Sequence, residues 1–129
     1  MKYLADYTEK AISKALKDNG SFFAFGDDQF NKAKKEGIKY VSVGSGLIAP
    51  KDNAEKLLKE ITEAHKNGIK KDIKENGKNN IIKRELNNHE AYYTGEIDQT
   101  VDALKDYNIT DKDILTVFNE ERGKEENYD

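Results

Sequence analysis

The 129-residue chain sets 22 Lys and Arg residues against 25 Asp and Glu residues, carries a net charge of −3, and contains no cysteine. This length predicts one domain, and the absence of cysteine excludes a disulfide framework and a zinc–thiolate site. No apolar run reaches the ~18 residues of a membrane span, and Asp6 and Glu9 come too early for a secretory signal. We therefore expect a cytoplasmic protein that does not bind a membrane.

The first third of the chain predicts a helix, a strand and a second, shorter helix. Apolar residues recur on one face over Tyr3–Asp18 at a 3.6-residue period, which indicates a helix that ends at Gly20. Phe22–Phe25 follows as a short strand, and its aromatic side chains on both faces are typical of an inner strand. Asp27 is expected to cap a short helix over Asp28–Glu36.

The middle of the chain predicts a second strand over Lys39–Val43, followed by a glycine-containing break and a short continuation at Leu47–Ala49. A strongly amphipathic helix is expected from about Asn53 to Lys66. Gly68 is expected to break that helix, and Glu75–Asn80 has the composition of a turn.

The last third predicts three further helices around one β-like run. Asn80–Asn88 buries apolar residues at a helical spacing, and His89–Tyr93 reads as a third β-like run. A helix lined by Ile97, Val101, Leu104 and Tyr107 comes next, and Thr110 is expected to cap the final helix.

The elements together predict an α+β fold with five or six amphipathic helices around a small sheet of two or three strands. We expect a single domain over residues 1–123 and a mobile acidic tail over residues 124–129. The order and direction of the strands stay open, as does the oligomeric state.

The glycine loop Gly44-Ser45-Gly46 follows a strand and precedes a helix. Backbone N–H groups in such a loop can hold a phosphate, although the chain lacks the Lys-Ser/Thr pair of a P-loop and the third glycine of a dinucleotide site. The alternative interpretation is a tight turn that needs positive φ angles, which glycine adopts without strain. The second interpretation is favoured.

His89 and Glu90 beside Tyr92 form the densest cluster of polar and aromatic residues in the sequence. A neutral histidine next to a carboxylate can act as a general base or a metal ligand. A metal site needs three or four ligands, and the second histidine, His65, lies on the apolar stripe of another helix, so no metal or other cofactor is predicted. The structural interpretation, which is favoured, has His89 end its helix with its ring hydrogen-bonded to the backbone.

Basic residues between Lys51 and Arg84 number 10 against 6 acidic ones, without an arginine cluster or interleaved aromatic residues. That excess is too small to indicate a nucleic-acid interface, so direct nucleic-acid binding is not favoured.

Acidic residues dominate the last quarter of the chain. Residues 1–89 carry 18 basic against 13 acidic residues, for +5, whereas residues 90–129 carry 4 against 12, for −8. Asp98, Asp102 and Asp106 recur every four residues, and Glu120 and Glu121 extend the acidic run. Like charges at that helical spacing are mutually destabilising, so the pattern indicates a surface that meets a basic partner.

Three short strings carry a partial resemblance to a group of known proteins: F-F-A-F-x-x-x-Q-F at Phe22–Phe30, V-S-V-G-S-G at Val41–Gly46, and L-N-N-H-E at Leu86–Glu90. With the Lys-, Asn- and Ile-rich composition, they resemble uncharacterised small proteins carried by phages and mobile elements of low-GC Gram-positive bacteria. That resemblance implies a setting in which small proteins without catalytic motifs often inhibit host defence, as anti-CRISPR proteins do.

The sequence thus predicts a non-enzymatic, phage-type protein that binds and inhibits a host defence complex or nuclease through an acidic surface at Asp98, Asp102, Asp106, Glu120 and Glu121. The expected partner is a host protein or nucleoprotein complex. The alternative is a small-ligand or nucleotide-binding module in which Gly44-Ser45-Gly46 and His89-Glu90 form the pocket.

Overall fold

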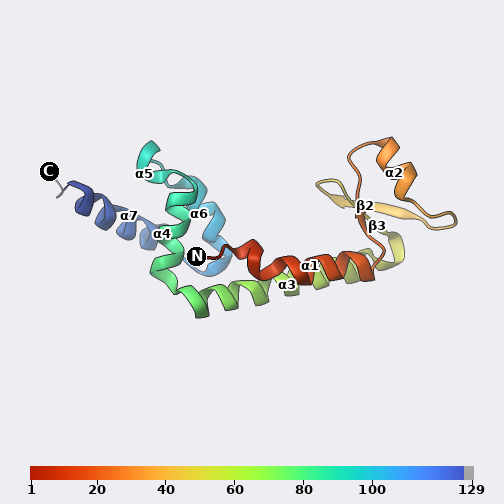
Figure 1. Ribbon diagram of the computed structural model, residues 1–129, viewed down its shortest axis with the longest axis horizontal. Coiled ribbons are helices and arrows are strands. Elements are labelled where there is room, and N and C mark those ends of the chain that lie inside the picture. The colour runs from red at the N-terminus through yellow and green to blue at the C-terminus, as the bar shows by residue number, and fades with distance from the viewer. Residues whose placement is uncertain (127–129) are drawn as a thin grey trace. The chain divides into compact units, whose positions relative to one another are not determined.

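The computed structural model describes residues 1–126, with side chains as far as residue 124. Helices and three short antiparallel strands give an α+β chain, as the sequence predicted (Figure 1). The chain divides into two compact units, here called the sheet unit (Ala5–Gly68) and the helical unit (residues 1–4 together with the chain from Ile69 onward). A single domain over residues 1–123 stays a prediction.

The sheet unit contains all three strands of the described chain and the first helices. In chain order its elements are α1 (Leu4–Asp18), β1 (Phe22–Phe23), α2 (Asp27–Ala33), β2 (Tyr40–Gly44), β3 (Leu47–Pro50), the 3₁₀ helix η1 (Lys51–Asn53) and the first part of α3 (Ala54–Asn76). The strand order is β1-β3-β2, so β3 is the central strand and pairs with both neighbours in antiparallel fashion.

The prediction that Phe22–Phe25 forms an inner strand is wrong. β1 is an edge strand of two residues, and the side chains of Phe23 and Phe25 are 53% and 74% exposed. The reason is a tight turn after β2, which folds β3 back between β2 and β1. The backbone then leaves the sheet, because the N–H of Phe25 donates to the side chain of Gln29 instead of to a strand.

Asp27 does not cap α2, in contrast to the prediction. The helix begins at Asp27 itself, and Gly26 occupies the capping position without any side-chain hydrogen bond. Asp27 and Asp28 therefore lie in the first turn, where carboxylates interact favourably with the positive end of the helix dipole. The helix ends at Ala33, three residues earlier than predicted.

The two faces of the small sheet pack differently. Ala49 of β3 is buried with Ala15 of α1 and Leu57 of α3 in a compact apolar cluster. Rings of Phe22, Phe30 and Tyr40 form an aromatic group, with centroids 5.4 Å apart for Phe22 and Tyr40 and 5.7 Å apart for Phe30 and Tyr40. Edge-to-face rings of this kind hold α2 against β1 and β2.

The predicted break at Gly68 does not occur, because α3 continues from Ala54 to Asn76. A glycine inside a helix costs about 1 kcal/mol relative to alanine, and the burial of neighbours such as Ala64 and Ile69 outweighs that cost. The helix ends instead at Gly77, whose φ of 77° lies in the region that favours glycine, within the turn predicted at Glu75–Asn80.

The helical unit contains the rest of α3 followed by α4 (Lys78–Asn88), α5 (Ala91–Thr94), α6 (Asp98–Leu104), the 3₁₀ helix η2 (Lys105–Tyr107) and α7 (Asp111–Glu126). Its core is the larger of the two and gathers apolar side chains from every one of these helices. The buried members are Ile69, Ile81, Ile82, Leu86, Ala91, Leu104, Tyr107, Ile109, Ile114, Val117 and Phe118.

Two local predictions for the helical unit have opposite outcomes. His89–Tyr93 is not a strand, because Glu90 takes a left-handed conformation with φ of 55° and starts the short helix α5 directly after α4. Thr110 does cap α7: its hydroxyl accepts the N–H of Asp113 at 3.1 Å, and the Asp113 carboxylate accepts the N–H of Thr110 at 3.2 Å. Helix α7 includes residues 124–126 of the predicted tail, and residues 127–129 lie outside the described part of the chain.

Candidate functional site

A buried ion pair lies at the centre of the helical unit. Asp72 of α3 is fully buried, and the guanidinium of Arg84 on α4 donates to both of its carboxylate oxygens, at 2.8 and 2.9 Å. This two-bond geometry is the strongest form of a carboxylate–guanidinium contact. The pair joins α3 to α4 on either side of the turn at Gly77.

Two more donors complete the environment of Asp72. The hydroxyl of Tyr107 donates to it at 2.5 Å, and the side-chain amide of Asn76 donates at 2.8 Å. Burial by itself would raise the pKa of Asp72, but the hydrogen bonds from Arg84, Tyr107 and Asn76 outweigh it and hold the pKa below its ordinary value of 3.8. Burial and the bond to Asp72 raise the pKa of Tyr107. Asp72 therefore stays ionised and Tyr107 stays protonated at neutral pH.

Arg84 uses its remaining donors inside the same unit. Its Nη1 donates to the carbonyl of Lys2 at 2.9 Å, and its Nε donates to the carboxylate of Glu85 at 3.0 Å. The Tyr3 ring lies over the guanidinium, 5.6 Å from its carbon atom. These contacts fix the N-terminal residues against α4 and leave Arg84 engaged on all sides, which is the arrangement of a structural residue.

This network was not among the predicted sites. From the sequence, Asp72 and Arg84 were counted only in the charge balance of the segment from Lys51 to Arg84. The signal that could have revealed them is position: Asp72 lies three residues after the buried Ile69 on a helix, and Arg84 lies between the buried Ile82 and Leu86.

The predicted cluster at His89 lies at the corner between α4 and α5. His89 follows the last residue of α4, as predicted, but its ring is not hydrogen-bonded to the backbone. Its Nε2 lies 3.4 Å from a carboxylate oxygen of Glu85, the residue that also accepts from Arg84. The side chain is thus turned toward the interior network of the helical unit.

A shallow hollow of about 310 Å³ opens at the same corner, lined by Asn87, Glu90, Tyr92 and Tyr93. Tyr92 is held by stacking on Phe118 of α7, with ring centroids 5.4 Å apart. Tyr93, in contrast, is 92% exposed. Glu90 has the left-handed backbone described above, and such backbone strain in a non-glycine residue is often found at functional positions. The hollow therefore combines a carboxylate, an amide and tyrosine rings in a preformed geometry.

The predicted acidic ridge lies directly after this corner. Asp98 and Asp102 are exposed on successive turns of α6, whose opposite side is buried through Thr100 and Leu104. In the described part of the chain neither carboxylate forms an ion pair. Asp106 is exposed as well, but it lies on η2, so the regular four-residue ridge ends with α6.

The glutamates of α7 differ from each other. Glu120 is exposed, whereas Glu121 is half-buried and accepts both Lys83 and Lys124, each at 3.2 Å. Those two lysines lower the pKa of Glu121. Glu121 therefore contacts residues within the helical unit, and Asp98, Asp102, Asp106 and Glu120 are the predicted carboxylates that remain exposed.

The loop Gly44-Ser45-Gly46 is a hairpin turn between β2 and β3, and its three φ values are 110°, 51° and 79°. The interpretation as a tight turn with positive φ angles is thus confirmed. A β-carbon on Gly46 would lie 2.3 Å from Cε1 of the Phe25 ring, so the ring packs directly on this glycine. This loop belongs to the sheet unit and His89-Glu90 belongs to the helical unit, so neither unit by itself holds both parts of the alternative ligand pocket.

No three His, Cys, Asp or Glu side chains within residues 1–126 come together as a metal site would require. No helix of that part of the chain is long and apolar enough to cross a membrane.

No curated protein and no solved structure matches the chain. The sequence profile of DUF7659, described as a family of unknown function, matches residues 4–123, which includes both compact units. The chain therefore belongs to the family DUF7659.

Proposed function

We propose that this protein is a non-enzymatic binding protein of phage or mobile-element type, which inhibits a host defence complex or nuclease in the bacterial cytoplasm. The contact surface is the outward face of α5 and α6, formed by Glu90, Tyr93, Asp98 and Asp102. The partner presents a basic surface of a protein or nucleoprotein complex.

The single observation behind this proposal is the pair of unneutralised carboxylates on α6. Asp98 and Asp102 repel each other at this spacing, and no described lysine or arginine offsets the repulsion. Two other acidic groups of the same unit are paired with lysines: Asp113 with Lys78 at 2.8 Å and Glu121 with Lys83 at 3.2 Å. An acidic face left open in this setting favours association with a basic partner by electrostatic steering.

The hollow at the α4–α5 corner suits a particular contact from such a partner. An arginine side chain placed there would meet the Glu90 carboxylate, the Asn87 side chain and a tyrosine ring. Carboxylates bind guanidinium with two hydrogen bonds, and tyrosine faces attract it through cation–π contacts. Tyr93 offers the exposed aromatic surface that frequently dominates binding energy at protein interfaces.

The proposal is tested with variants of the proposed contact surface, and a control variant of equal charge is described below. The wild-type protein is used to capture partners from a bacterial lysate, and the captured complex is assayed for nuclease activity and affinity. Asp98→Asn/Asp102→Asn is expected to raise the Kd about tenfold or more, mainly through slower association at low salt, and to relieve the inhibition. Tyr93→Ala is expected to weaken binding mainly through faster dissociation.

The matched control is Asp27→Asn/Asp28→Asn, which removes two exposed carboxylates from α2 of the sheet unit. It lowers the net negative charge by the same amount and is expected to leave binding unchanged. If both double variants lost affinity equally, the loss would follow from the overall charge alone, and the proposed surface would be contradicted. A captured complex whose activity does not change on binding would contradict the inhibitory role.

A further inference from the structure

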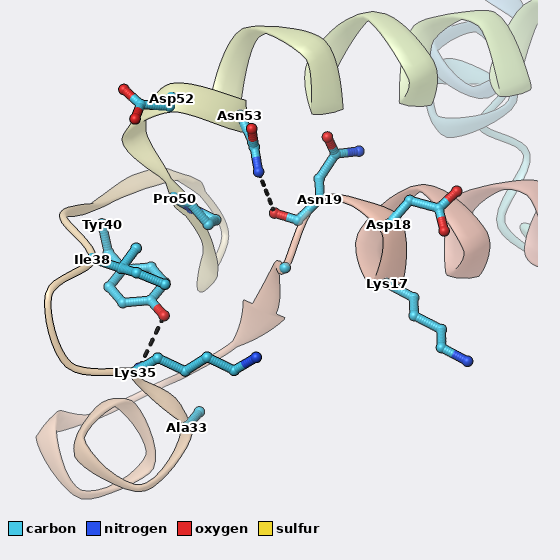
Figure 2. A pocket seen from close by; sticks show the side chains of 11 residues that line it. Lys17, Asp18, Asn19, Ala33, Lys35, Ile38, Tyr40, Pro50, Asp52 and Asn53 are labelled. Atoms are coloured by element: carbon cyan, nitrogen blue, oxygen red, sulfur yellow. Dashed lines mark hydrogen bonds between the residues drawn. The ribbon is translucent and has the colours of Figure 1, made fainter.

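A second hollow, of about 480 Å³, lies entirely within the sheet unit (Figure 2). It is built where the end of α1, the loop between α2 and β2, the end of β3 and the helix η1 meet. Neither the proposed acidic surface nor the predicted glycine loop contributes to it. Hollows of this size, with a few polar groups on apolar walls, are the usual form of small-molecule sites.

Hydrogen bonds hold the walls of this hollow in place. The side-chain amide of Asn53 donates to the carbonyl of Asn19 at 3.3 Å, which ties η1 to the residue that follows α1 (Figure 2). Asn19 is itself buried and donates to the carbonyl of Ala15 and the carboxylate of Glu60, at 2.8 and 2.9 Å. The polar groups of these asparagines are therefore used to build the wall.

Tyr40 forms a second fixed wall with a hydroxyl at its end. Its ring is held edge-on by Phe22 and Phe30, and its hydroxyl oxygen accepts the N–H of Lys35 at 3.0 Å (Figure 2). The hydroxyl proton donates to no described residue, so it remains available to a ligand. A rigid donor of this kind orients a bound oxygen atom.

Apolar side chains supply the remaining surface. Pro50 is buried and its ring is fixed, and Ile38 beside it keeps 42% of its surface exposed although it lines the hollow. Figure 2 shows Ile38, Pro50 and the Tyr40 ring grouped on one side of the hollow. Covering this surface would remove apolar area from water, which favours a ligand with an apolar body.

The charges at the hollow favour an anion. Lys17 and Lys35 line it, and neither side chain forms an ion pair with any residue in the described chain. Of the two acidic residues that line it, Asp18 is already paired with Lys14 at 2.6 Å. The carboxylate of Asp52 points away from Asn53 and Asn19 at the rim (Figure 2). The Lys17 side chain extends away from Tyr40 and Lys35 (Figure 2), so the free donors that remain are the Lys35 ammonium and the Tyr40 hydroxyl.

We propose that this hollow binds a small organic anion, in which a carboxylate or phosphate head is carried on a short apolar body. The head interacts with the Lys35 ammonium and the Tyr40 hydroxyl, and the body packs on Ile38 and Pro50. This site is independent of the proposed acidic surface, since the two lie in different units of the chain.

The test uses benzoate and phenyl phosphate as probes, with benzamide as the neutral probe of the same shape. Amide chemical shifts of the full-length protein are followed by NMR during titration. Binding of one of the two anions is sufficient. We expect saturable shifts at Lys35, Ile38 and Asn53 with that anion, and a Kd near or below about 10 mM for a probe of this size. The anion with the lower Kd shows whether the hollow prefers a carboxylate or a phosphate head. Benzamide is expected to bind several-fold more weakly.

Two lysine variants decide whether the hollow recognises the charge. Lys35→Met keeps the aliphatic stem and is expected to raise the Kd of the anion about fivefold, as the loss of one partly exposed ion pair should. Lys10→Met removes an exposed lysine of α1 outside the hollow and should leave the Kd unchanged. Equal effects of the two variants, equal binding of benzamide, or no saturable shift with either anion would overturn the proposal. Asp98→Asn/Asp102→Asn should leave anion binding unchanged, so this result is separable from that of the partner capture.

Discussion

The two units of this protein bury their residues in different ways. The helical unit buries a broad apolar core drawn from α3 to α7 and places the ion pair of Asp72 and Arg84 inside it. The sheet unit has a small cluster around Ala15, Ala49 and Leu57, and it leaves the rings of Phe23 and Phe25 largely exposed. The helical unit therefore combines a large apolar interior with a buried charge, whereas the sheet unit has a small apolar cluster and leaves aromatic rings exposed.

The difference shows where substitutions should matter. A buried charge has no water to solvate it when its partner is removed. Substitutions at the few buried polar positions of the helical unit should therefore lower its stability strongly. The exposed rings of the small sheet can move when a neighbour changes. Substitutions in the sheet unit should therefore lower stability chiefly where the backbone takes a strained conformation. Three substitutions test this comparison, from the largest expected effect to the smallest.

Arg84→Met is expected to have the largest effect. It keeps the aliphatic stem but leaves the fully buried Asp72 carboxylate without its two guanidinium bonds, which should lower the free energy of unfolding by about 3–5 kcal/mol. Urea denaturation at neutral pH measures the change. Adding Asp72→Asn should restore part of the loss, because the uncompensated charge is then gone. The control is Lys14→Met, which breaks the exposed pair with Asp18 and should give no measurable change. Equal losses in the two single variants would contradict the distinction between the units.

Tyr107→Phe should have an intermediate effect that depends on pH. It removes the hydroxyl donor to Asp72 and should cost about 1–3 kcal/mol at neutral pH. Because the pKa of Asp72 is lowered in the folded state, its contribution to stability is present above the ordinary value of 3.8 and is lost as the pH falls through the folded pKa. Loss of the donor moves that pKa back toward 3.8. The difference between wild type and variant should therefore shrink as the pH is lowered below 3.8. Urea denaturation across this range measures it, and a difference that stays constant would show that the bond does not depend on the carboxylate charge.

Gly46→Ala in the sheet unit should have the smallest of the three effects. Its φ of 79° is left-handed, and the new β-carbon would meet the Phe25 ring, although that exposed ring can move aside. The expected loss is about 1–2 kcal/mol, close to the cost of a left-handed conformation for a residue with a β-carbon. Ser45→Gly, at φ of 51° in the same turn, should stabilise the protein slightly. Thermal unfolding measures the stability of the two variants. An unchanged Tm for Gly46→Ala would show that the turn tolerates a side chain.

Local patterns in the sequence predicted much of the helical structure. The 3.6-residue period located α1, α4 and α7, the positive-φ turn at Gly44–Gly46 was read from its glycines, and Thr110 was recognised as the cap of α7. These features depend on residues within a few positions of one another, so sequence is sufficient for them.

Candidate sites were predicted less completely. The exposed carboxylates of Asp98 and Asp102 lie on α6, as the spacing of charges suggested. Glu121 was expected to face a partner, yet Lys83 and Lys124 hold it within the unit. Charge in a sequence shows which residues can form ion pairs, but only the packing of α4 against α7 decides that Lys83 reaches Glu121.

By itself, the sequence determined the positions of α1, α4 and α7, the glycine turn and the excess of acidic residues late in the chain, because each of these follows from neighbouring residues. Only the tertiary structure decided that β3 is the central strand and that Asp72 is buried against Arg84 and Tyr107. Tertiary packing likewise joined Lys35, Tyr40 and Asn53 around one hollow. The physical reason is that strand order and the burial of a charge depend on free energies of contact between residues far apart in the chain, which no local pattern contains.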